Sequence, residues 1–364
     1  MPDISSQTQR LLFSLLAILL LSSCDPFTSP QSLMDEYPIR LARVLDVNAQ
    51  NSPQTTPAIW LRVRERRVTI PDIEINMLAF LDLYGCDLQV VVGERNAILG
   101  KVMQPLNRLR YSQRFIEEAG ICIDSIDDAS LKQTLKQAAI LKRQQLPAEI
   151  WQASWASAEM AELFSHTAQP MPVDRPLANS QQLSEDFIYL NQTVDALLSG
   201  ANKTALTRWG KIQQRWQYQD DLGALIKSAQ QLTQMLNTGS ALLKQRIDEK
   251  PLCYQGKPNP RARQMEGVFF KIYIGHVQPY IALVSQHRDA LLPAVRQFAA
   301  QHQNTAPPAV KKYWQRYLLE SPDSIWTEFD TALKTHTGLW QDLLDQCGLR
   351  PKAAEPKRLQ QENS

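Results

Sequence analysis

The sequence is poor in the residues that build turn-rich sheets, metal sites and covalent catalysts. It has 13 glycines, five histidines and five cysteines among 364 residues. No HExxH, CxxC or GxSxG motif occurs, so the usual patterns of a zinc protease, a structural zinc site and a serine hydrolase are missing. Scarce glycine beside abundant Leu, Gln and Ala favours helices over sheets. We expect a mainly α-helical protein with no metal and no other cofactor.

A strong charge of either sign is also absent. The formal net charge is +2, with 44% hydrophobic and 21% charged residues. Because nucleic-acid-binding proteins carry a marked excess of basic charge, this balance does not favour a nucleic-acid partner. The composition is that of an ordinary globular chain long enough for two hydrophobic cores, and it leaves the oligomeric state open.

The longest apolar run lies near the amino terminus. Residues 11–21 form a run of eleven, preceded by Arg10 and followed by Ser22 and Ser23. As a helix at about 1.5 Å per residue it reaches roughly 16 Å, about half of a ~30 Å hydrocarbon core. This length is typical of a secretory signal peptide, which we assign to residues 1–23. We expect no later segment to be long and apolar enough to cross a membrane.

Residues 21–24 read Leu-Ser-Ser-Cys and resemble a lipobox, in which signal peptidase cuts before a lipid-modified cysteine. We therefore expect lipid on Cys24 to hold the protein at a membrane surface, and several acyl chains on one residue make such anchoring stable. Asp25 follows directly and resembles the signal that retains Gram-negative lipoproteins in the inner membrane. The predicted location is the periplasmic face of the inner membrane, with the outer membrane as the alternative.

Once Cys24 is lipidated, an even number of cysteines remains for an oxidising periplasm, namely Cys86, Cys122, Cys253 and Cys347. We favour disulfides between Cys86 and Cys122 and between Cys253 and Cys347. Other connectivities and reduced buried thiols stay open as alternatives.

Residues 165–180, SHTAQPMPVDRPLANS, contain three prolines and little apolar periodicity. They indicate a linker between an N-terminal helical lobe at 30–164 and a C-terminal helical lobe at 181–348. Residues 24–29 are predicted to be a lipidated linker and residues 349–364 a disordered tail. The favoured disulfides agree with this division, since each lies within one lobe.

Apolar residues at alternating spacings of three and four predict two long amphipathic helices in the C-terminal lobe. One stripe runs through residues 183–197, with Ser180 as a candidate cap, and the other through 222–243, where Gly239 occupies one step. The turn residues 200–202 between the stripes suggest an antiparallel helical hairpin.

Caps and prolines predict further helices at residues 30–45, 72–84, 88–102, 105–119, 127–145, 148–164, 261–303, 309–319 and 325–345. The helix at 261–303 is expected to break near Pro279, and Ser321 or Asp323 to cap the last helix. Residues 59–70, IWLRVRERRVTI, alternate apolar and basic side chains, which favours a short strand or extended segment.

Four arginines in that segment are candidate contacts to anionic lipid headgroups, namely Arg62, Arg64, Arg66 and Arg67. They follow the predicted lipid anchor closely, and each basic side chain near such a surface adds about 1 kcal/mol. The alternative is a solvated edge interrupted by Glu65.

Residues 93–103 read GERNAILGKVM, and the pieces RLARVLDV at 40–47 and LYGCDL at 83–88 precede them. On these residues the chain resembles a family of uncharacterised Gram-negative lipoproteins, domain-of-unknown-function family 3080, across most of its mature length. The resemblance supports the lipoprotein interpretation and implies no activity, cofactor or catalytic residue.

Glu94, Arg95, Asn96 and Lys101 form the best polar cluster in the sequence. Glu94 and Lys101 share a face if the segment is helical, so the cluster is a candidate for lining a cleft or for anchoring a buried ion-pair network. We favour the structural role.

The leading functional hypothesis is a non-enzymatic, membrane-tethered helical protein with an interaction or accessory role in the cell envelope. Its expected partners are the membrane, through Cys24, and an envelope protein that docks on an amphipathic helix. The alternative is an envelope enzyme that acts on lipid or peptidoglycan through a cleft near Glu94.

Overall fold

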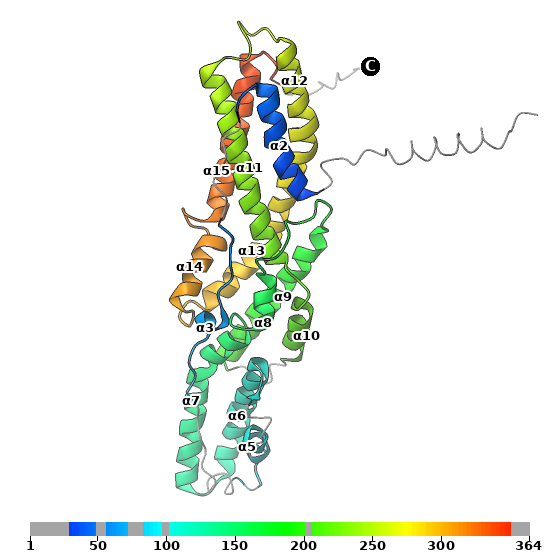
Figure 1. The fold of residues 1–364 in the computed structure, drawn as a ribbon. Helices are drawn as coiled ribbons and strands as arrows, with labels where there is room; N and C mark the ends of the chain where they lie inside the picture. Colours follow the sequence, from blue (N-terminus) through cyan, green and yellow to red (C-terminus); the bar gives the residue numbers. More distant parts are fainter. Residues whose placement is uncertain are drawn as a thin grey trace, which may run out of the picture.

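The computed structural model describes residues 29–48, 56–71, 83, 85–96, 102–200 and 206–350. Within these ranges the chain forms helices and no strand, which confirms the predicted mainly α-helical class. In chain order they are α2 (Pro30–Leu45), α3 (Val63–Arg66), α5 (Leu88–Asn96), α6 (Pro105–Ser125), α7 (Ala129–Ala153), α8 (Ala158–Leu163), α9 (Leu177–Leu198), α10 (Thr207–Trp216), α11 (Asp221–Glu249), α12 (Pro260–Val268), the π-helix η2 (Phe269–Val277), α13 (Gln278–Gln301), α14 (Pro308–Tyr317) and α15 (Ile325–Gln346). Figure 1 shows an elongated rod, with α5, α6 and α7 at one end and α2, α11, α12 and α15 at the other.

The end of the rod that contains α2 is a bundle with a hydrogen-bonded centre. Tyr37 Oη lies 2.7 Å from His336 Nε2 and accepts a hydrogen bond from Trp340 Nε1 at 2.8 Å. Ser240 Oγ lies 3.2 Å from His336 Nδ1. Here α11 approaches α15 closely, since a Cβ on Gly239 would lie only 2.7 Å from His336 Cε1. This contact explains why glycine occupies one step of the apolar stripe.

The opposite end consists of α5 and the antiparallel pair α6 and α7, which share a small hydrophobic core of their own. The disulfide Cys86–Cys122 joins the turn before α5 to α6. The second disulfide, Cys253–Cys347, lies in the other bundle and joins the α11–α12 connection to the end of α15. The structure therefore confirms the favoured pairing.

The segment predicted to be a linker, residues 165–180, packs into the main core. The Met171 backbone N–H donates to Ser228 Oγ at 2.8 Å. Gly223 leaves room for the chain, because a Cβ there would lie 2.3 Å from the Ser165 carbonyl oxygen. The larger hydrophobic core of the described residues includes side chains from residue 33 to residue 347, on both sides of this segment. Residues 165–180 therefore do not separate two hydrophobic cores.

Both stripe helices form, but the predicted hairpin between them is wrong. The main partner of α9 is α13, whereas α11 packs along α15 and α2. The helix α10 intervenes between them in the chain. An apolar stripe shows which face of a helix is buried and does not show which helix covers it. For the same reason α2, which was expected in the N-terminal lobe, lies on α11 instead (Figure 1).

Two predicted caps are also wrong. Because α9 begins at Leu177, Ser180 lies inside that helix, buried, with its Oγ 2.7 Å from His287 Nδ1. The last helix, α15, is capped by Ser324, which accepts a hydrogen bond from the Thr327 N–H at 3.2 Å, and not by Ser321 or Asp323.

Several boundaries differ from the sequence prediction. α7 continues through Pro147, where a break between two helices was expected, and α8 is a short separate helix. The helix predicted at 88–102 is present as α5 over Leu88–Asn96, and residues 97–101 lie outside the described ranges. Residues 59–70 form no strand; the single turn α3 is flanked by extended residues at Arg62 and Arg67, so the predicted extended alternative holds in part.

The stretch Pro260–Gln301 stays helical where a break near Pro279 was expected. Instead, η2 widens the helix just before Pro279, with the Gln278 N–H donating to the Tyr273 carbonyl, and α13 continues the helix through the proline. By length and composition this helix is apolar enough to cross a membrane, contrary to the sequence expectation, and it is the one such helix in the described part of the chain. It packs against α2, α9 and α11.

Some predictions concern residues outside the described ranges. They include the signal peptide at 1–23, Cys24 and Asp25, the helix at 72–84 apart from its end, Lys101, and the tail beyond residue 350.

Candidate functional site

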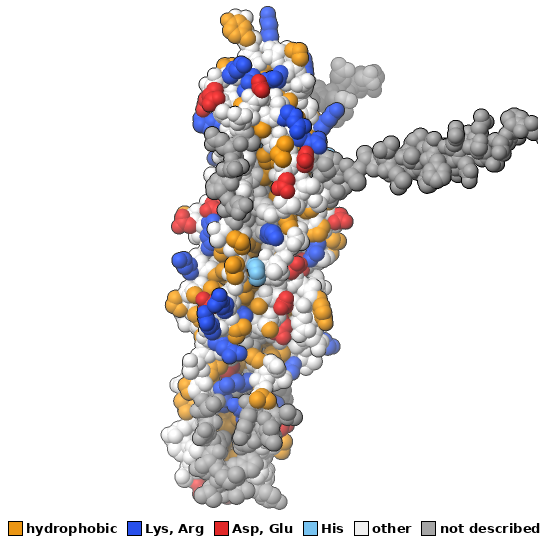
Figure 2. Space-filling view, viewed as in Figure 1, with side chains coloured by type: hydrophobic (Ala, Val, Ile, Leu, Met, Phe, Trp, Pro, Cys, Tyr) orange, Lys and Arg blue, Asp and Glu red, His pale blue; other side chains and the backbone are white. Residues whose placement is uncertain are grey.

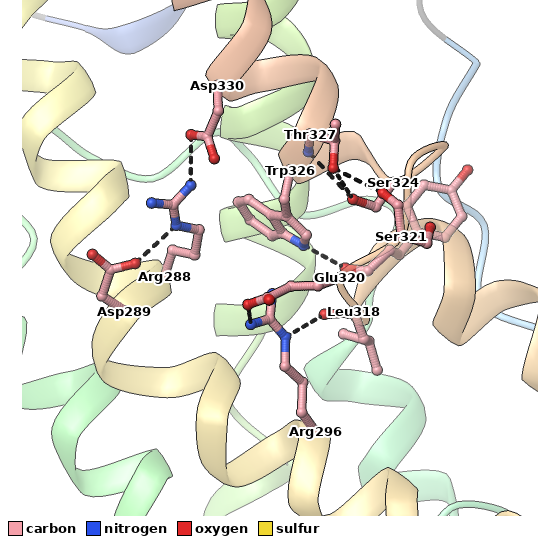
Figure 3. Close-up of polar contacts among 11 residues, drawn as sticks. Arg288, Asp289, Arg296, Leu318, Glu320, Ser321, Ser324, Trp326, Thr327 and Asp330 are labelled. Carbon is pink, nitrogen blue, oxygen red and sulfur yellow. Dashed lines mark hydrogen bonds and ion pairs between the residues drawn. The ribbon is translucent and has the colours of Figure 1, made fainter.

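A surface groove lies between α13 and the beginning of α15, beside the connection from α14. Its volume is about 420 Å³, within the range of about 300 to 1,000 Å³ that is common for ligand pockets. Figure 3 shows Trp326 between two arginines of α13. The lining residues are Arg288, Asp289, Pro293, Arg296, Glu320, Trp326, Thr327 and Asp330.

The local structure of the two helices positions this lining. The Ser324 cap starts α15 so that Trp326 falls in its first turn. Trp326 Nε1 donates to the Tyr317 carbonyl at 2.9 Å and ties the end of α14 to the start of α15. On the other wall, Pro293 lies inside α13 and supplies no backbone N–H, so the Asp289 carbonyl loses its usual helical partner beside the groove.

Arg288 is held by two carboxylates and an indole ring. Its Nε donates to Asp289 Oδ1 at 2.9 Å and its Nη1 to Asp330 Oδ1 at 2.8 Å. The guanidinium carbon lies 6.0 Å from the Trp326 ring centre, within reach of a cation–π contact. Burial alone would lower the pKa of Arg288, but the hydrogen bonds that it donates to Asp330 and Asp289 raise its pKa. The positive charge is therefore fixed in one place.

Arg296 is anchored in a similar way two turns further along α13. Its Nε donates to the Leu318 carbonyl at 2.7 Å, and its Nη1 pairs with Glu320. The side chain of Arg296 is 22% exposed, whereas that of Glu320 is 82% exposed. The arginine is thus nearly immobilised, and its carboxylate partner is open to solvent.

The groove can bind charged groups of both signs. Among the described residues, Nη2 of Arg288 and Nη2 of Arg296 have no hydrogen-bond partner. Exposed carboxylates stand next to both guanidinium groups. The described lining holds no His, Cys or Lys, and its three carboxylates and Thr327 are of types that can act as general base or nucleophile.

The sequence did not single out this groove. Its residues come from α13, α15 and the connection between α14 and α15, and no local spacing links them. The one local signal is Pro293 within a long apolar helix, where one backbone N–H is missing from the groove wall.

The polar cluster predicted from sequence lies elsewhere, at the end of α5. Glu94 pairs with Arg114 of α6 at 2.6 Å, and both side chains are about half exposed. Arg95 lies near Lys142, since its charge helps to lower the pKa of that lysine. The Asn96 side chain and Lys101 are outside the described residues. Within the described part, the structure therefore shows a surface ion pair at Glu94.

Sequence reasoning missed a buried ion cluster between α6 and α7. Lys142 Nζ and Arg108 Nε each lie 3.6 Å from Glu149 Oε1, and the Glu149 side chain is fully buried. Burial lowers the pKa of Lys142, and the nearby Glu149 opposes that shift. Lys142 also donates to Ser112 Oγ at 3.2 Å. Lys142 and Glu149 stand seven residues apart on the buried face of α7, which was the available sequence signal.

The four arginines predicted to touch lipid headgroups separate into two kinds. Arg66 is buried, and its Nη1 donates to the carbonyls of Trp155 and Ser157 at 3.0 and 2.8 Å, so Arg66 cannot contact a membrane. Burial, followed by the charge of Arg67, lowers the pKa of Arg66 to about 10.

The other three, Arg62, Arg64 and Arg67, are exposed. Figure 2 shows Lys or Arg side chains gathered on the surface over α3. A headgroup contact by these three stays a prediction.

The buried histidines are structural. His336 and His302 are almost completely inaccessible, and burial lowers their pKa values to about 3 and about 4. Tyr37 and His336 are close enough for proton transfer, but no substrate can reach either one. Within the described residues, no three His, Cys, Asp or Glu side chains are grouped as metal ligands.

Comparison with known proteins gives a family and no function. A family model described as protein of unknown function, DUF3080, matches residues 34–351. No curated protein matches the chain significantly, and no solved structure does so. Because the family model covers most of the chain, the protein belongs to the DUF3080 family of proteins of unknown function.

Proposed function

We propose that this chain is an exported lipoprotein that acts at the bacterial cell envelope as a non-enzymatic interaction or accessory protein. Residues 1–23 supply the export signal, and lipid on Cys24 supplies the anchor. Asp25 directs the protein to the periplasmic face of the inner membrane, with the outer membrane as the alternative.

The observation that carries the proposal is the sulfur chemistry. Every cysteine other than Cys24 takes part in a disulfide, Cys86–Cys122 at one end of the rod and Cys253–Cys347 at the other. Disulfides persist in oxidising compartments and are rare in the cytosol. A lone cysteine remains at the end of the signal segment, where a lipid-carrying cysteine is expected.

The shape and the chemistry of the described residues support a binding role. The rod presents long helical faces to its surroundings (Figure 1). Its histidines with lowered pKa values are neutral and enclosed, and Glu94 is occupied by a surface ion pair with Arg114. The alternative of an envelope enzyme with a cleft at Glu94 has less support from this geometry.

Metabolic labelling with radioactive palmitate tests the anchor. The wild-type protein should incorporate the label, and a Cys24→Ala variant should not. A matched Thr28→Ala variant, changed four residues further along the chain, should be labelled as strongly as the wild type. Equal labelling of wild type and Cys24→Ala would overturn the proposal.

Density-gradient separation of inner and outer membranes tests the location. The wild-type protein should sediment with the inner membrane, and an Asp25→Ser variant should move to the outer membrane. Recovery of both proteins in the outer membrane would overturn the sorting role of Asp25 and leave the anchor to be judged by the palmitate experiment.

A further inference from the structure

We propose that the groove between α13 and α15 binds a short zwitterionic peptide, with the peptide carboxylate at Arg296 and the peptide ammonium beside Asp289 and Asp330. The inference rests on the described groove alone. It does not depend on lipid anchoring or on the cellular location of the protein.

The mixed charge of the lining selects a zwitterion. Its charged side chains are two arginines and three carboxylates. A purely anionic ligand would meet the repulsion of the carboxylates, and a purely cationic ligand would meet that of two anchored guanidinium groups. A ligand that carries both signs can use the spare Nη2 donors and the exposed carboxylates together.

The local balance of charge sets the orientation. At Arg288 two carboxylates, Asp289 and Asp330, surround one guanidinium, so that end is net negative and suits an ammonium. At the other end, Arg296 faces a single carboxylate, Glu320, whose side chain is largely in solvent. A ligand carboxylate can displace that flexible partner and make a forked contact with the guanidinium.

The spacing sets the size. Arg288 and Arg296 are eight residues apart on α13, about 12 Å at about 1.5 Å per residue. An extended peptide advances about 3.3 Å per residue, so about three or four residues span the same distance. Trp326 lies between the two ends, buried in the groove wall (Figure 3).

Isothermal titration calorimetry on the purified full-length protein tests the ligand class. The probes are trialanine, N-acetyl-trialanine, which lacks the ammonium, and trialanine amide, which lacks the carboxylate. Trialanine should bind, and each blocked peptide should bind about tenfold more weakly or worse, the expected loss for one charge-assisted hydrogen bond. Glycerophosphoethanolamine, a zwitterion without peptide bonds, should bind more weakly than trialanine.

Substitutions then test the orientation. Arg296→Gln should weaken trialanine about tenfold and leave the weak binding of trialanine amide unchanged. Asp330→Asn should weaken trialanine and leave N-acetyl-trialanine unchanged. Glu320→Gln should not weaken trialanine, because Glu320 competes with the ligand carboxylate. Arg263→Gln, which removes an exposed ion pair on α12, is the matched control and should bind like the wild type.

Several results would overturn the proposal. One is that trialanine does not bind at concentrations up to about 10 mM, where even a millimolar Kd is visible. The others are that the three peptides bind equally well, or that glycerophosphoethanolamine binds more tightly than trialanine. Circular dichroism shows whether each variant is folded. If Arg296→Gln does not fold, Arg296→Lys keeps the charge without the fork and should still lose trialanine affinity.

Discussion

Acid should destabilise this protein through two buried histidines. His336 and His302 have pKa values of about 3 and about 4 in the folded chain, because burial disfavours their charged forms. The value in an unfolded chain is about 6.5. The unfolded chain therefore binds protons that the folded chain excludes. Stability is complete above about pH 7 and falls as the pH drops from about 6.5 towards the folded values.

The size of the effect follows from these pKa values. At about pH 5 both histidines are protonated in the unfolded chain and neutral in the folded one, which lowers the free energy of unfolding by about 2 kcal/mol for each histidine. The two histidines together should thus cost the wild-type protein about 4 kcal/mol between about pH 7.5 and about pH 5. The groups that contact the His336 ring, Tyr37, Tyr273, Ser240 and Trp340, do not titrate in this interval.

Urea unfolding followed by circular dichroism at the two pH values measures the effect. His336→Gln should be less stable than the wild type at about pH 7.5 by about 1 to 3 kcal/mol, since buried partners lose hydrogen bonds. Its loss of stability on acidification should be smaller by about 2 kcal/mol. His302→Gln should flatten the dependence by a similar amount. A pH dependence that is the same in the wild type and both variants would refute the reasoning.

Two further predictions concern a close approach and a buried charge. Gly223→Ala should lower the thermal unfolding temperature, because the added Cβ would lie 2.3 Å from the Ser165 carbonyl oxygen. Gly267→Ala has open space around the new Cβ and should raise the free energy of unfolding by about 1 kcal/mol. Equal effects of the two substitutions would contradict the packing described at Gly223. Glu149→Gln should cost about 3 to 5 kcal/mol in urea unfolding because Lys142 then keeps an uncompensated buried charge, and Glu94→Gln about 1 kcal/mol or less. A large loss of unfolding free energy in Glu94→Gln with a small loss in Glu149→Gln would contradict the assignment of Glu149, and not Glu94, to the stabilising ion pair.

Local signals in the sequence predicted most helices but not their partners. The helix predicted at 30–45 forms as α2, and the structure shows Ser29 as its cap and Pro30 in its first turn. The stripes of α9 and α11 likewise define buried faces. Which helices cover those faces depends on contacts between residues about a hundred positions apart, such as Ser180 with His287, and no local pattern encodes them.

The candidate site was harder to predict than the helices. Glu94 stands out in the sequence because it lies in a distinctive polar run, yet it forms an ordinary surface ion pair. Arg288, Trp326 and Glu320 look like scattered polar and aromatic residues until α13 and α15 bring them together. The disulfide pairing was favoured because four cysteines allow only three connectivities and each favoured pair lies within one predicted lobe.

The proposal that this protein is exported and lipidated is tested most directly by the mass of the intact protein, purified from membranes without reductant and treated with a thiol-alkylating reagent. Our account predicts a chain that begins at Cys24, carries acyl groups there, and takes up alkyl groups on Cys86, Cys122, Cys253 and Cys347 only after reduction. A chain that retains residues 1–23 without lipid, or that is alkylated on these cysteines before reduction, would contradict it.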